Sequence, residues 1–143
     1  MRPIFTELVL RVENLAQEAA FWEEAVGLER VRPKPGEPVE RIAIFDLGGP
    51  RLEIHAGGKP LPRPTGREQV SGAPILLVED CEAALQRALE WGATQVAPIS
   101  APVPGSAFVY VLSPGGQPVG FVQGDERHYR QQLGMKPLGS YWS

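Results

Sequence analysis

The chain has 143 residues, of which 43% are hydrophobic and 22% are charged, the composition of one compact globular domain over residues 1–143. Its formal net charge is -3 without a cluster of Lys and Arg, which excludes nucleic acid as the expected partner. No signal-like stretch opens the chain, and no run approaches the roughly 18 apolar residues of a membrane span. We therefore expect a cytoplasmic protein without a membrane partner.

The first part of the chain predicts one strand, one helix and three further strands. Residues 4–12 alternate and are rich in branched side chains, which favours a strand. Asn14 is a good helix N-cap, apolar residues then recur at helical spacing over 15–26, and Gly27 suits the end of a helix. Three short apolar runs separated by Pro and Gly predict the remaining strands, over residues 28–32, 41–47 and 51–55.

After residues 4–58, a Pro-rich and Gly-rich stretch over 59–72 is typical of a linker. The same order then restarts within residues 73–123. A strand is predicted first, then a helix that is N-capped by Asp80 and closed by Gly92, and then three strands. The five predicted ranges are 73–78, 81–91, 94–99, 106–112 and 118–123. Residues 124–143 form a C-terminal extension with one predicted short helix over 125–133.

The two halves match at the residue level. Val12-Glu13-Asn14 corresponds to Val78-Glu79-Asp80, and Glu18-Ala19-Ala20 corresponds to Glu82-Ala83-Ala84. The two matches follow in the same order at the start of the predicted helix in each half, so an internal duplication of one βαβββ unit explains them. Trp22 and Trp91 fall on helix faces that should pack against the sheets, and we expect both in the core.

Three segments, over residues 6–28, 77–93 and 113–123, resemble the vicinal oxygen chelate superfamily, which includes glyoxalase I, bleomycin-resistance proteins and extradiol dioxygenases. This resemblance implies an α+β fold in which two tandem βαβββ units form a cupped, glyoxalase-like mixed sheet. It also implies a pocket lined by sheet side chains for a small organic molecule, and a homodimer as the common assembly.

Metal-dependent members of the superfamily place one ligand on the first and one on the last strand of each unit. The correspondence puts these four positions at Glu7, Glu53, Ala73 and Gly120, and the last two offer no side-chain ligand. Two carboxylates hold a divalent metal ion weakly, so no metal cofactor is expected. The open alternative is a reduced metal site of Glu7, Glu53 and His55, since His55 shares the strand face of Glu53.

The ligand-binding candidates are the same three residues together with aromatic side chains on predicted strands, namely Glu7, Glu53, His55, Phe45, Phe108 and Tyr110. For the two glutamates the competing interpretation is ion pairing with Arg11 or Arg51, which have the same strand-face parity. For the aromatic residues it is packing in the core.

Two functions follow from this pattern. The first is a non-enzymatic binding protein of the glyoxalase and bleomycin-resistance type, which sequesters a drug or metabolite in a cup with an incomplete metal site. The alternative is a glyoxalase-like lyase or isomerase that uses Glu7 or Glu53 as a general base, with or without a weakly held divalent metal ion.

Overall fold

A computed structural model describes residues 2–60 and 62–138 and contains the two predicted βαβββ units. In the first unit, β1 (Glu7–Val12) leads into α1 (Leu15–Ala20), which continues as a π-helical segment η1 (Phe21–Val26). β2 (Arg30–Arg32), β3 (Ile42–Asp46) and β4 (Arg51–Ala56) follow. The sheet order is β1-β4-β3-β2, with β1 parallel to β4 and the other pairs antiparallel.

The second unit repeats this arrangement. It contains β5 (Ile75–Leu77), α2 (Cys81–Glu90), β6 (Thr94–Gln95), β7 (Ala107–Leu112) and β8 (Pro118–Gln123). The sheet order β5-β8-β7-β6 matches that of the first sheet, and β5 is likewise parallel to β8. The predicted α+β fold of two tandem βαβββ units is therefore confirmed. Each unit forms its own four-stranded mixed sheet.

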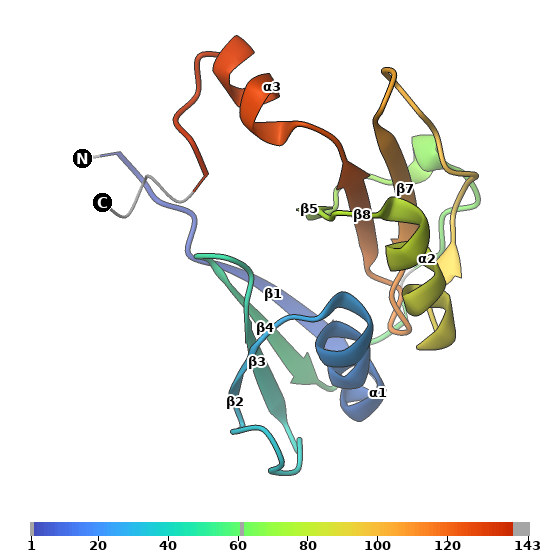
Figure 1. Cartoon of the computed structure of the whole chain (residues 1–143). Helices are drawn as coiled ribbons and strands as arrows, with labels where there is room; N and C mark the ends of the chain where they lie inside the picture. The colour runs from blue at the N-terminus through green and yellow to red at the C-terminus, as the bar shows by residue number, and fades with distance from the viewer. Residues whose placement is uncertain (1, 61, 139–143) are drawn as a thin grey trace.

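Two shorter helices lie outside the repeated units. A short 3-10 helix η2 (Arg67–Gln69) interrupts the stretch between the units, and α3 (Glu126–Gln132) follows β8. α3 lies apart from both sheets and buries none of its side chains (Figure 1).

Both unit helices begin at the caps predicted from the sequence. The Asn14 side chain accepts a hydrogen bond from the Gln17 N–H at 3.1 Å, and Asp80 accepts one from the Ala83 N–H at 3.0 Å. Each cap satisfies a backbone donor that has no partner within its helix. Gly27, with φ of 84°, ends the first helix in the left-handed conformation that glycine adopts without strain.

The helices of the two units pack together, and the sheets flank them (Figure 1). One face of each sheet and the inner sides of the helices form a single core that includes Trp22, Phe45 and Phe121. The prediction that Trp91 also lies in the core is wrong. Trp91 comes just after the end of α2, beyond the buried stripe of the helix, and its side chain is 42% exposed.

Because each core-facing strand residue alternates with an outward one, each sheet also has an outer face that points away from the shared core. Among the described residues, no helix is long and apolar enough to cross a membrane.

Candidate functional site

The outer face of the first sheet carries a cluster of charged side chains. On β4, Leu52 and Ile54 are buried, so the alternate residues Arg51, Glu53 and His55 project from the opposite face. The parallel register places Glu7 of β1 directly opposite Arg51. The structure thus brings Glu7, Glu53 and His55 onto one face, as strand parity predicted for Glu53 and His55 and as the superfamily resemblance implied for Glu7.

Arg51 lies between the two glutamates. Its Nη2 is 2.8 Å from Glu7 Oε2, and its Nε donates a hydrogen bond of 3.0 Å to Glu53 Oε2. The contact with Glu7 is close but poorly angled for a hydrogen bond, so Glu7 Oε2 accepts none and the attraction is chiefly electrostatic. On the other side of Glu53, Oε1 lies 3.5 Å from His55 Nε2.

In this arrangement the pKa values of the two carboxyl groups shift in opposite directions. The hydrogen bond with Glu53, followed by partial burial, raises the pKa of Glu7, although the Arg51 charge opposes the rise. The same hydrogen bond and that from Arg51 lower the pKa of Glu53. When the glutamates share a proton, it therefore resides on Glu7. The ion-pairing interpretation holds for Arg51, whereas Arg11 lies opposite His55 and makes no ion pair among the described residues.

The outer face of the second sheet is apolar. Phe108 and Tyr110 of β7 project from it with their rings in an edge-to-face contact, at a centroid distance of 4.7 Å. On the edge strand β5, Ile75 and Leu77 are 45% and 49% exposed. No hydrogen bond, ion pair or ring contact between described residues joins this apolar face to the glutamate cluster of the first sheet.

The residues of the four superfamily ligand positions do not fit a metal ion. Gly120 lies opposite Ile75 in the β5–β8 ladder, and a Cβ atom there would stand 2.5 Å from Ile75 Cδ1 and 3.0 Å from Phe108 Cζ. The space of a fourth ligand is thus filled by apolar side chains, while Arg51 places a cation at the two carboxylates of the first unit. In the described part of the chain, no three His, Cys, Asp or Glu side chains are grouped to hold a metal ion.

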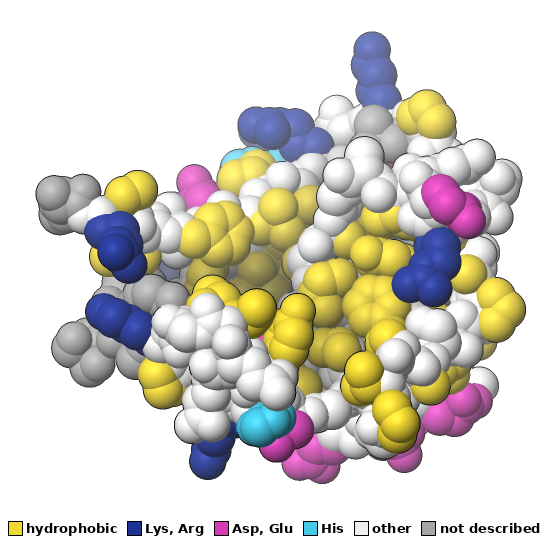
Figure 2. All heavy atoms as spheres, turned by 90° about the horizontal axis from the view of Figure 1, so that it is seen from above, with side chains coloured by type: hydrophobic (Ala, Val, Ile, Leu, Met, Phe, Trp, Pro, Cys, Tyr) yellow, Lys and Arg dark blue, Asp and Glu magenta, His cyan; other side chains and the backbone are white. Residues whose placement is uncertain are grey.

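Two cavities lie next to β5. One, of about 510 Å³, is lined mainly by aliphatic side chains from both units, and Glu126 and Leu138 of the C-terminal extension complete it. Hydrophobic side chains gather around a hollow on the face that carries α3 (Figure 2). The other cavity, of about 460 Å³, shares Leu77 and Val78 with the first. Both volumes suit a small organic molecule.

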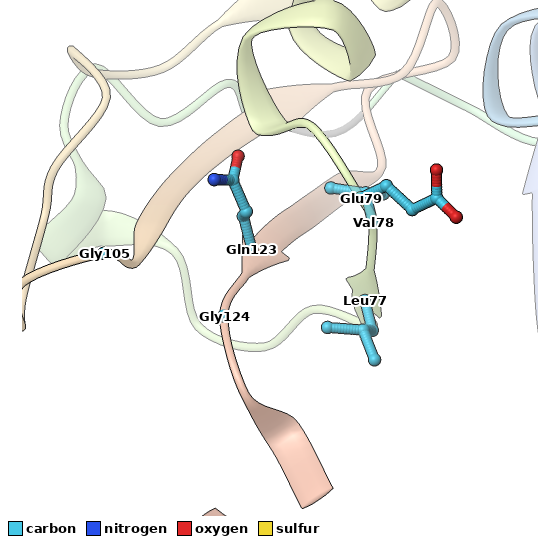
Figure 3. A pocket seen from close by; sticks show the side chains of 6 residues that line it. All are labelled: Leu77, Val78, Glu79, Gly105, Gln123 and Gly124. Atoms are coloured by element: carbon cyan, nitrogen blue, oxygen red, sulfur yellow. The ribbon is translucent and has the colours of Figure 1, made fainter.

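The second cavity is built where β5 and β8 end. Leu77 and Glu79 extend from the segment that leads into α2, and the Gln123 side chain points from β8 toward the start of that helix (Figure 3). Gln123 Oε1 accepts a 2.8 Å hydrogen bond from the Cys81 N–H, which fixes the side chain at the wall.

None of the six predicted ligand-binding residues lines these two cavities. Phe45 is a correction, because its side chain is fully buried in the core on the inner face of β3 and offers no ligand-binding surface. One feature of the sequence could have indicated the cavity residues of β5. The run Ile75-Leu76-Leu77-Val78 is apolar on both faces, which is unusual for a strand at a sheet edge.

Solved structures with the same architecture support the fold. A glyoxalase-related enzyme from Fulvimarina pelagi is 19% identical, covers 87% of this chain and 89% of its own, and has a TM-score of 0.65. The fosfomycin resistance protein FosX from Listeria monocytogenes is 15% identical, with coverage of 89% and 98% and a TM-score of 0.68. TioX from Micromonospora sp. ML1 is 18% identical, with coverage of 85% and 98% and a TM-score of 0.60.

A search of curated proteins gave no significant match. The family model described as a glyoxalase-like domain, in contrast, matches residues 7–122, which span both βαβββ units. The agreement of this match with the duplicated fold shows that the chain belongs to the glyoxalase-like domain family.

Proposed function

We propose that this protein binds a small organic molecule without a metal ion, in the manner of the bleomycin-resistance type of the superfamily. The observation that carries the proposal is the apolar outer face of the second sheet, where Ile75 and Phe108 fill the space around Gly120. A surface of exposed aliphatic and half-buried aromatic side chains suits the apolar body of a ligand. The polar cluster of Arg51, Glu53 and His55 suits its hydrogen-bonding groups.

We further propose that two copies of the chain complete the pocket. Within one chain the outer faces of the two sheets point away from the shared core, so the polar and apolar groups do not face each other. β1 and β5 are edge strands, and Val9, Ile75 and Leu77 on them are each more than a third exposed. A second copy would cover these edges and bring the first sheet of one chain toward the second sheet of the other.

A lyase or isomerase remains the second candidate, and the raised pKa of Glu7 favours it. A carboxylate whose pKa is raised above its ordinary value is a stronger general base than an ordinary glutamate. The two candidates differ in the fate of a bound molecule. Ligand recovered chemically unchanged after long incubation supports a binding protein, whereas conversion supports an enzyme. The cytoplasmic location is part of the proposal and rests on the sequence argument.

The test is a thermal-shift screen of amphipathic aromatic compounds, followed by calorimetry with the strongest hit. Phe108→Ala should weaken binding of that ligand roughly tenfold, because it removes an aromatic contact surface from the outer face of the second sheet. The matched control is Phe5→Ala, which removes a 63% exposed aromatic ring outside both sheets and should leave the affinity unchanged. Equal effects of the two substitutions, or no effect of either, would argue against binding at this face.

A further inference from the structure

We infer that Arg51 is the resident cation of the first-sheet site, and that its guanidinium keeps divalent metal ions away from Glu7 and Glu53. This inference shares one premise with the proposed function, namely that the site works without a metal ion. It goes further, because it assigns the exclusion of metal to one side chain and expects a cation site to appear when that side chain is removed.

The guanidinium of Arg51 occupies the space between the two carboxylates. Zn²⁺ binds carboxylate oxygens at about 2.0–2.2 Å. Arg51 already contacts Oε2 of Glu7 at 2.8 Å and Oε2 of Glu53 at 3.0 Å. A metal ion that bridged these two oxygens would lie in the volume of the guanidinium nitrogens, at a distance where two cations repel strongly.

The sheet holds Arg51 in place. Its backbone N–H donates to Thr6 O at 2.9 Å, which fixes the parallel register and sets Arg51 opposite Glu7. Glu53 is two residues further along the same strand and therefore projects from the same face. Both carboxylates thus reach the guanidinium from neighbouring positions of a rigid ladder.

Removal of Arg51 would leave Glu7, Glu53 and His55 as donors on this face. Glu7 Oε2 accepts no hydrogen bond now, and Glu53 Oε2 would lose the one that it accepts from Arg51 Nε. His55 Nε2 lies on the other side of Glu53, 3.5 Å from Oε1. Two carboxylates and an imidazole are ligands that Zn²⁺ accepts. Among the described residues these three side chains are not grouped around one point while Arg51 is present, so Zn²⁺ binding in an Arg51 variant requires them to turn into the volume that the guanidinium leaves.

The experiment is calorimetric titration of the full chain with Zn²⁺ alone, in wild type, Arg51→Gln, Arg51→Met and Arg11→Gln. Both Arg51 variants should bind about one ion per chain, at least about tenfold more tightly than wild type, because a nearby positive charge is gone. The methionine variant shows that the gain does not come from a new amide ligand. Arg11 lies on the same sheet face and makes no ion pair with another described residue, so the Arg11→Gln variant should bind Zn²⁺ like wild type.

Melting temperatures with and without Zn²⁺ provide a second readout and verify folding. The Arg51 side chain is 49% exposed, so its removal should leave the core intact. Zn²⁺ should raise the melting temperature of the Arg51 variants, and a chelator should reverse the rise. Unchanged Zn²⁺ affinity in both Arg51 variants, or an equal gain in Arg11→Gln, would overturn the inference. Neither result depends on any organic ligand, so the proposed function stands or falls separately.

Discussion

Glu18 is a fully buried carboxylate that links the two units. Its Oε2 accepts a 3.0 Å hydrogen bond from Trp22 Nε1 in the same helix, and its Oε1 accepts one of 2.7 Å from the Gly115 N–H in the turn between β7 and β8. A Cβ at Gly115 would lie 2.7 Å from Val12 Cγ1, so only glycine lets the turn approach this closely. The contact therefore fixes how the second unit sits on the first.

Replacing Glu18 with Ala should lower the free energy of unfolding by about 2 to 4 kcal/mol, because one buried and one part-buried N–H donor lose their acceptor. Urea unfolding gives the value. Glu24→Ala serves as the control, since that side chain is exposed in the same helical region. A loss for Glu18→Ala no larger than that of Glu24→Ala would contradict the linking role.

The sequence predicted part of the glutamate cluster and missed the rest for a definable reason. Strand alternation places Glu53 and His55 on one face of β4, and the family resemblance implied that Glu7 of the first strand lies beside them. Alternation could not choose between Arg11 and Arg51 as the ion-pair partner, because both have the required parity. The β1–β4 register makes that choice, since it sets Glu7 opposite Arg51 and Arg11 opposite His55. Register between strands 44 residues apart leaves no local signal in the sequence.

Local sequence signals predicted the type and order of the helices and strands better than they predicted the length of each element. Caps and terminal glycines located both unit helices, yet no local signal predicted the π-helical geometry of η1, in which Phe21 and Trp22 are fully buried. The strand predicted over 94–99 is only Thr94–Gln95, and the chain pairs again with β7 at Ser100. Pro98 lies between these points and has no N–H to donate to a ladder.

The turn between β3 and β4 depends on the charge of Asp46. Its Oδ1 accepts hydrogen bonds from Gly48 N–H at 2.7 Å and Gly49 N–H at 3.1 Å. The bonds from Gly49 and Gly48 lower the pKa of Asp46 below its ordinary value. A lowered folded-state pKa adds stability above the pKa of the unfolded chain, near 4, and this stability is lost as the pH falls through the folded value.

Asp46→Ala should therefore destabilise the protein by about 1 kcal/mol at pH 7, a modest value because the exposed carboxylate is screened by solvent. The difference from wild type should shrink below about pH 4 as the wild-type carboxyl is protonated. Urea unfolding of both proteins between pH 3 and pH 7 measures this difference. A destabilisation that is the same at every pH would mean that the charge of Asp46 has no part in holding the turn.

At the scale of the whole molecule, the duplication explains why each sheet alone is an incomplete pocket. The helices join the units through one core, so the two outer faces look outward, one polar and one apolar. A repeat found in the sequence predicts two similar units but not how they pack on each other. For this reason the sequence predicted the residues of each face and not the separation between them.

The most direct test of metal-independent ligand binding in a paired assembly is native mass spectrometry of protein purified without chelators and mixed with the strongest ligand from the screen. We expect the mass of two chains with one organic molecule per chain and no transition metal. One tightly held metal ion per chain, with organic ligand bound only when that ion is present, would contradict it.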